Sequence, residues 1–263
     1  MKQRIITAVA FGVLYIVFIL IGHFPFALFT ALIAAIAFME LAAMKKISAG
    51  SPPAVIGAIF VVLLVIQATN TGFSIYVPMI KLSAIFVIVM LIYMVFSKNQ
   101  FSFDQAAHIF LAAFYIGFSF YLLVHLRYSS LAEVFFVQIL MWCTDSGAYF
   151  VGRKLGKRKL SPHISPNKSI EGAIGGVIVA VVAAIIFELI VPGQLFPSWG
   201  ILLLVSVIIS VFGQLGDLAE SAIKRYYGVK DSGNILPGHG GLLDRFDSMI
   251  FILPVLFIFN VIV

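Results

Sequence analysis

Residues that suit phosphate chemistry are concentrated near the C-terminal end of the chain, between residues 217 and 247. Four polar residues recur there at helical spacing and so share one stripe of a helix: Asp217, Glu220, Ser221 and Lys224. Carboxylates are hard oxygen ligands of the kind that Mg²⁺ prefers, and lysine neutralises phosphate oxygens. This stretch therefore predicts a site for metal-dependent phosphate chemistry.

A glycine-rich segment, Pro237-Gly238-His239-Gly240-Gly241, stands shortly before the last predicted helix. Glycines let backbone N–H groups approach a phosphate, and a helix N-terminus favours an anion. Asp244 and Asp247 follow, three residues apart, so both can face one site. Each feature also has an ordinary explanation: Asp244 as a helix cap, the glycines as a turn, and Glu220 with Lys224 as a surface ion pair. We expect a phosphate site because all of these features occur together in a chain with little other charge.

The chain as a whole is too apolar for a water-soluble protein. Of its 263 residues, 62% are hydrophobic and 11% are charged, whereas soluble domains are about 45–50% apolar and about 25% charged. This composition excludes a soluble enzyme, a nucleic-acid-binding protein and a disordered chain, and it predicts an integral membrane protein. Cys143 is the one cysteine, so an intrachain disulfide is excluded.

Nine apolar runs are candidates for membrane-spanning helices. Helices are favoured over strands because the runs are continuous, whereas the strands of a membrane barrel alternate. We therefore expect an all-α integral membrane protein, a bundle of about nine transmembrane helices. We expect it to form a single polytopic domain, with N-terminal helices in residues 1–125 and catalytic helices and loops in residues 126–263. In the seventh run, Gly172, Gly175 and Gly176 predict close helix packing. The nine runs cover residues 5–21, 24–44, 54–69, 76–96, 105–125, 131–151, 171–191, 199–216 and 245–263.

The basic residues predict the orientation of the chain. With a cytoplasmic N-terminus and nine spans, every lysine and arginine except Lys81 and Arg127 falls on the cytoplasmic side. More than half of the charged residues lie in two windows, 145–171 and 217–247, which two spans separate and which therefore share that side. We expect a multi-pass protein of the cell's inner (plasma) membrane whose active site faces the cytoplasm.

A longer pattern includes these residues: Ser221, Ile223-Lys224-Arg225, Lys230-Asp231, Gly233, Leu236-Pro237, His239-Gly240-Gly241-Leu242 and Asp244-Arg245-Phe246-Asp247. This pattern resembles the signature of the phosphatidate cytidylyltransferases, also called CDP-diacylglycerol synthases. The upstream segment Ser165-Pro166-Asn167-Lys168-Ser169 is also similar to bacterial members of that family. The resemblance implies that CTP and phosphatidic acid of the lipid bilayer give CDP-diacylglycerol and pyrophosphate with Mg²⁺. It leaves open a second cation and a homodimer.

The resemblance also implies roles for individual residues. Asp217 and Asp244 correspond to the metal-binding aspartates of the family, and Asp231 and Asp247 either join them or lie behind them. Lys168 and Ser169 are expected to bind substrate phosphate. The basic residues expected to contact the phosphates of the two substrates are Lys224, Arg225, Lys230 and Arg245, and the substrate-binding set is completed by Ser221, Gly240 and Gly241.

The sequence also suggests roles for a histidine, for an aspartate at membrane depth and for three glutamates. A phosphate monoester has a second pKa of about 6, so the lipid phosphate needs no strong base, and we expect His239 to orient a phosphate. Asp145 lies at membrane depth, where acids are usually functional, so we expect it to contact the nucleotide or to support the site. Glu40, Glu133 and Glu188 lie nearer the ends of their runs and are expected to be interfacial or structural.

Other functions are compatible with parts of this pattern. A CTP-dependent lipid kinase, or a cytidylyltransferase for another lipid phosphate, would need the same groups. A kinase releases CDP, whereas a cytidylyltransferase releases pyrophosphate. A transporter would place charges near the bilayer midplane, on paired interrupted helices. The charges gather at one side of this chain, which argues against transport.

Overall fold

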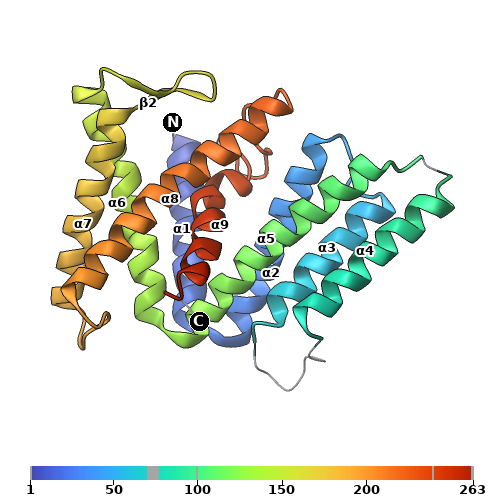
Figure 1. The fold of residues 1–263 in the computed structure, drawn as a ribbon, viewed down its shortest axis with the longest axis horizontal. Helices are drawn as coiled ribbons and strands as arrows, with labels where there is room; N and C mark the ends of the chain where they lie inside the picture. The colour runs from blue at the N-terminus through green and yellow to red at the C-terminus, as the bar shows by residue number, and fades with distance from the viewer. Residues whose placement is uncertain (1, 70–76, 99, 239, 262–263) are drawn as a thin grey trace. The chain divides into compact units, whose positions relative to one another are not determined.

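The computed structural model describes residues 2–69, 77–98, 100–238 and 240–261 of the chain. In these residues the secondary structure is almost entirely helical, with nine helices and one two-stranded β-hairpin (Figure 1). Each predicted apolar run corresponds to one helix. The helices are α1 (Lys2–Ile21), α2 (His23–Met44), α3 (Pro52–Ile66), α4 (Met79–Phe96), α5 (Phe103–Ser129), α6 (Leu131–Leu155), α7 (Ile170–Ile190), α8 (Trp199–Tyr226) and α9 (Leu243–Ile258), and the strands are β1 (Lys159–Ser161) and β2 (Ser165–Ser169).

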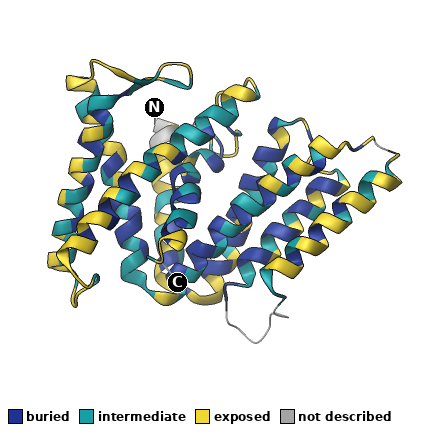
Figure 2. Cartoon of the chain, viewed as in Figure 1, coloured by how far each residue is buried: buried dark blue, intermediate teal, exposed yellow. Residues whose placement is uncertain are grey.

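Six of the described helices are long and apolar enough to cross a bilayer: α2, α4, α5, α6, α7 and α8. The apolar part of α1, Ile6–Ile21, and helix α3 are apolar but shorter. Figure 2 shows exposed residues along α4 and α7. Large apolar side chains are exposed on both helices, among them Ile80 and Phe96 of α4 and Leu189 of α7. Apolar surface of this extent is stable against lipid and unstable against water. The predicted all-α membrane fold is confirmed.

The residues cluster into two compact units, and the first comprises Met1–Tyr128 and Tyr227–Phe246. It therefore combines α1 to α5 with the segment that leads into α9. The start of α9 is held by an aromatic cluster, because the ring of Phe246 lies 5.4 Å from that of Tyr15 and 5.3 Å from that of Phe120. Helices α2 and α3 pack closely at Gly57, where a Cβ would collide with the ring of Phe38.

The second unit comprises Ser129–Tyr226 and Asp247–Val263, and so contains α6, α7, α8, the hairpin and the remainder of α9. Helix α7 approaches α6 along the predicted glycines. A Cβ at Gly176 would lie 2.8 Å from the carbonyl oxygen of Thr144, and a Cβ at Gly175 would lie 2.5 Å from Val151. Close packing at these glycines is thus confirmed. A single polytopic domain divided near residue 125 stays a prediction.

The hairpin between α6 and α7 was not predicted from the sequence. Its strands are antiparallel, with Lys159 opposite Ser169 and Ser161 opposite Ser165. The strands are short and polar, so they lack the alternation of apolar and polar residues that identifies a strand in a sequence. The hairpin ends directly at the N-terminus of α7 (Figure 1).

Candidate active site

The residues predicted for the site belong to both units. The second unit contains Asp145, Lys168, Ser169, Asp217, Ser221, Lys224, Arg225 and Asp247. The first unit contains Lys230, Asp231, Gly240, Gly241, Asp244 and Arg245. The remaining predicted residue, His239, lies outside the described residues.

A cavity of about 620 Å³ in the second unit is lined by polar residues from three elements. Asp145 of α6, Lys168 and Ser169 of β2 and Asp217 of α8 line it together with Gln214, one turn before Asp217. Four residues predicted from distant parts of the sequence therefore meet at one cavity. They include both acids and a lysine, the combination that phosphate chemistry requires.

An ion pair between Lys168 and Asp217 joins the hairpin to α8. The Oδ2 atom of Asp217 accepts a hydrogen bond from Lys168 Nζ, and Oδ1 accepts one from the hydroxyl of Ser221 at 3.3 Å. The side chains of Lys168 and Asp217 remain 28% and 32% exposed, so a substrate in the cavity can reach them. The charge of Asp145 repels that of Asp217, and Lys168 offsets part of this repulsion. The cavity is therefore lined by a cationic group and two carboxylates.

The hairpin that presents Lys168 is held at both of its ends. Glu171 in the first turn of α7 accepts the backbone N–H groups of Lys157 and Arg158 at 3.0 and 3.1 Å, which fixes the chain where it leaves α6. Ser169 caps α7 by accepting the N–H of Gly172 at 3.1 Å. Ser169 is buried, and the role that the structure shows for it is that of a helix cap. Phosphate binding by Ser169 stays a prediction.

Lys224 is engaged inside the second unit. Its amine forms an ion pair with Glu220, one turn earlier on α8, and the two side chains are only 12% and 6% exposed. The pair anticipated for an exposed surface is therefore present but largely shielded from solvent. Asp247 of α9 accepts the N–H of Ser248 at 2.7 Å, and its charge interacts with those of Asp217 and Lys224. The end of α8 is thus surrounded by a network of charges.

The donor set of the cavity is compatible with Mg²⁺. Among the described residues, no three histidine, cysteine or acidic side chains are arranged as a ready-made metal site. Asp145 and Asp217, however, line the same cavity. Mg²⁺ in phosphate-transfer sites is commonly held by one or two carboxylates, with water and substrate phosphates as the other ligands. Two carboxylates beside an open cavity fit this chemistry.

The segment before α9, in the first unit, is organised by the carboxylate of Asp244. Its Oδ2 atom accepts the N–H groups of Ser232 and Gly241, each at 2.9 Å, and lies 3.0 Å from the Ser232 hydroxyl. A backbone hydrogen bond also crosses this segment, because Leu236 donates its N–H to the carbonyl of Gly240 at 3.1 Å. Gly240 has a φ of +83°, a conformation that favours glycine. Asp244 thus holds the glycine-rich segment in a closed loop.

A second carboxylate, that of Glu40 in α2, binds the same loop. Its Oε1 accepts the N–H of Leu242 at 3.0 Å, and its Oε2 accepts the N–H of Leu243 at 2.9 Å and the hydroxyl of Ser232 at 3.0 Å. Glu40 is only 5% exposed. The N–H groups at the start of α9, which the sequence suggested for a substrate phosphate, are therefore satisfied by a carboxylate of the protein itself.

The sequence did not show that Glu40 binds the loop before α9. The sequence predicts an interfacial or structural role near a span end, and the structure shows that Glu40 is buried and structural. The available signal was an acid in the otherwise uncharged helix α2, since acids at membrane depth require partners.

Four further predicted residues are exposed and can meet a soluble substrate: Arg225, Lys230, Asp231 and Arg245.

This chain is similar to known proteins over nearly its whole length. The model of a family described as the cytidylyltransferase family matches residues 2–263. A phosphatidate cytidylyltransferase of Bacillus subtilis (strain 168) is 44% identical over 261 residues, which cover 98% of this chain and 96% of the relative. Relatives with the same name are similar at 41% identity over 256 residues in Staphylococcus epidermidis and at 42% over 258 residues in Staphylococcus haemolyticus, in each case covering 97% of both chains.

Proposed function

This chain belongs to the cytidylyltransferase family, and we propose that it transfers a cytidylyl group from CTP to phosphatidic acid. The products are CDP-diacylglycerol and pyrophosphate, a step of phospholipid biosynthesis. Family membership confirms the resemblance seen in the signature residues, and it makes the chain a multi-pass membrane nucleotidyltransferase. The observation that carries the proposal is the cavity of the second unit, in which Lys168 is paired with Asp217 beside Asp145.

The chemistry requires positioning more than proton transfer. An oxygen of the lipid phosphate attacks the α-phosphorus of CTP, and the bond from that phosphorus to the β-phosphate oxygen breaks. Since the second pKa of a phosphate monoester is about 6, the attacking oxygen is already deprotonated near neutral pH. The main obstacle is the repulsion between two polyanions. Lys168 supports the proposal because it brings a positive charge to the cavity.

We assign Asp217 two tasks in this reaction. It orients Lys168 through their ion pair, and it would hold Mg²⁺ together with Asp145. When bound, the cation neutralises charge on the phosphate oxygens of CTP and of the transition state. Metal binding by Asp231, Asp244 and Asp247 stays a prediction. A second cation also stays a prediction.

We also propose that the active site faces the cytoplasm of a bacterial inner membrane. The distribution of lysine and arginine supports this orientation. Cytoplasmic CTP would then reach the cavity without crossing the bilayer. A cysteine introduced at Lys157 in a Cys143→Ser background should react with an impermeant maleimide only after the cells are permeabilised. Labelling in intact cells would show that this loop lies outside the cytoplasm and would contradict the proposed orientation. A homodimer remains a proposal, and light scattering of the detergent-solubilised protein tests it.

The decisive experiment uses the purified full-length chain in detergent with labelled CTP, Mg²⁺ and phosphatidic acid. We expect equal amounts of CDP-lipid and pyrophosphate, and an Asp217→Asn variant should be at least 100-fold slower. Glu133→Gln, at the far end of α6 from the cavity, is the matched control and should retain activity. Release of CDP instead of pyrophosphate would identify a lipid kinase. Product formed only with another lipid phosphate would change the substrate. No product with any lipid phosphate would refute the proposal.

A further inference from the structure

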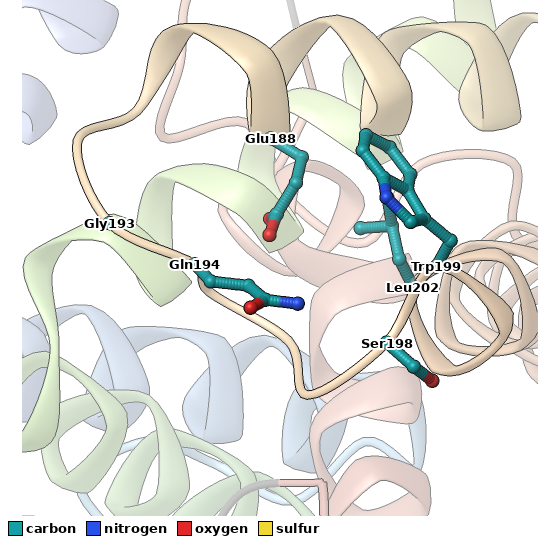
Figure 3. Close-up of a pocket in the computed structure, with 6 residues that line it drawn as sticks. All are labelled: Glu188, Gly193, Gln194, Ser198, Trp199 and Leu202. Atoms are coloured by element: carbon teal, nitrogen blue, oxygen red, sulfur yellow. The ribbon is translucent and has the colours of Figure 1, made fainter.

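The second unit has another cavity, at the end of α7 and α8 opposite to the Lys168–Asp217 pair. It has a volume of about 310 Å³ and lies where Ile190 ends α7 and Trp199 begins α8. Its lining consists of Glu188, Gly193, Gln194, Ser198, Trp199 and Leu202 (Figure 3). At 1.5 Å per residue, about 24 Å of helix α7 separates Glu188 from Gly172, which lines the larger cavity. The two cavities are therefore separate sites.

The carboxylate of Glu188 is only half satisfied at this cavity. Its Oε1 accepts the backbone N–H of Leu195 at 3.0 Å. Its Oε2 is buried and, within the described part of the chain, has no hydrogen-bond partner. Figure 3 shows the carboxylate and the amide of Gln194 directed toward the same space, with the indole of Trp199 beside them. A buried carboxylate oxygen without a partner is unfavourable, so a positive charge in the adjacent cavity would stabilise Glu188.

The surroundings of Glu188 favour a cationic donor. Glu188 is the one charged residue between Glu171 and Asp217. At the same end of the unit, the first turn of α6 adds another acid, Glu133, which lines a neighbouring cavity with Leu195. The lysines and arginines of the second unit lie at its other end, in residues 153–168 and in the last turn of α8. This end is therefore acidic without a basic side chain of its own.

The lining residues indicate which cation the cavity suits. A divalent metal takes about six or more hard oxygen ligands. Ca²⁺ draws most of them from the protein, and Mg²⁺ is held by carboxylates together with substrate phosphates, whereas this cavity offers one carboxylate. An ammonium group needs a few acceptors and is also attracted by an indole face. Glu188, Gln194 and Trp199 provide such groups. The volume of the cavity is near the lower limit for a ligand pocket, enough for a small amine and too small for a lipid body.

We propose that this cavity binds an alkylammonium group, with Glu188 as its counter-ion and Trp199 against it. The cavity lies at the end of two apolar membrane-length helices, the level at which lipid headgroups and interfacial tryptophans are found. The ammonium comes either from the ethanolamine headgroup of a membrane lipid or from a free amine. Its binding is independent of the proposed transfer reaction.

The test uses Trp199 as its own reporter. The chain has two tryptophans, so Trp142→Phe leaves Trp199 as the one source of indole fluorescence. This full-length protein in detergent is titrated with short-chain phosphatidylethanolamine, with phosphatidylglycerol of the same chain length, with ethanolamine hydrochloride, and with NaCl at equal ionic strength. We expect a saturable change in emission with the amine compounds and none with phosphatidylglycerol or NaCl. Saturation by the lipid at concentrations where ethanolamine has no effect identifies the headgroup as the source, and saturation by ethanolamine alone identifies a free amine.

Variants separate binding from a structural effect. Glu188→Gln should weaken the amine response at least tenfold without lowering the melting temperature, because it removes a buried charge that has an unsatisfied oxygen. Glu133→Gln, which alters the neighbouring cavity only, should weaken the response by less than threefold. Gln194→Leu should also weaken it and serves if Glu188→Gln fails to fold. The proposal is overturned if no amine gives a saturable change, or if folded Glu188→Gln responds like its parent.

Discussion

Replacing Glu40 with glutamine is a direct test of how the loop before α9 is held. The substitution keeps the shape of the side chain but exchanges one carboxylate oxygen for an NH₂ group. That carboxylate accepts three hydrogen bonds in the structure, from the N–H groups of Leu242 and Leu243 and from the hydroxyl of Ser232. An amide has one acceptor oxygen, so at least one of these buried donors loses its partner.

The size of the effect follows from the contacts. In the less costly orientation, the amide oxygen stays with Leu243 and Ser232, and the NH₂ group faces the N–H of Leu242. A hydrogen bond to a charged group contributes about 1.5–3 kcal/mol, and an anion at a helix N-terminus contributes a further 0.3–1 kcal/mol or so. We expect Glu40→Gln to destabilise the loop by about 2–4 kcal/mol, which corresponds to roughly 30- to 900-fold faster amide exchange.

Hydrogen–deuterium exchange with mass spectrometry measures this change in the detergent-solubilised protein. Peptides that cover Leu242 and Leu243 should exchange faster in Glu40→Gln, whereas peptides from α7, in the other unit, should not. Asp104→Asn provides a matched control, because Asp104 is an exposed acid in the first turn of α5 and belongs to the same unit. Unchanged exchange at Leu242 and Leu243 would show that Glu40 does not hold the loop.

Three further substitutions test other contacts. Lys168→Gln should slow CDP-lipid formation at least 100-fold but barely change the melting temperature, since an ion pair this exposed contributes about 0–1 kcal/mol; turnover within threefold of the parent would contradict its role. Gly176→Ala should lower the stability of the second unit by about 1–3 kcal/mol in thermal unfolding, because its Cβ would lie 2.8 Å from a carbonyl oxygen of α6. Gly213→Ala, which has nothing within 4 Å, is the control and should be neutral or stabilising. Arg127→Met should lower the melting temperature, with a loss of about 1.5–3 kcal/mol, because the Arg127 guanidinium donates to carbonyl oxygens in the last turn of α1; an unchanged melting temperature would show that these bonds contribute little.

The helices could be predicted from the sequence because lipid imposes a simple rule on it. A helix that crosses the bilayer must be apolar over most of its length, so each span appears as a continuous run with polar breaks. The extension of α8 beyond its apolar run could also be predicted, since Asp217 and Ser221 are one turn apart and do contact each other. The hairpin could not, because strand pairing between short polar segments leaves no periodic pattern.

The types of residue in the candidate site could be predicted from the sequence, but most of their contacts with other elements could not. Lys168 and Asp217 were both named, but their ion pair joins elements that are 49 residues apart and depends on how α7 packs against α8. The anion at the start of α9 was expected to be a substrate phosphate, and a carboxylate from α2 occupies that position. Spacing within one helix can be read from the sequence, whereas a partner on another helix is set by packing that the sequence does not display.

The contact between Glu40 and Ser232 also has a consequence for how the protein is made. The two residues are 192 positions apart. A ribosome adds about 5–20 residues per second, so Ser232 emerges roughly 10–40 s after Glu40. During that time α2 is already synthesised, while the donors that will bind its carboxylate do not yet exist. The early N-terminal helices therefore carry an acid that needs water or another polar partner, and the first unit is completed only when the segment from Tyr227 to Phe246 arrives.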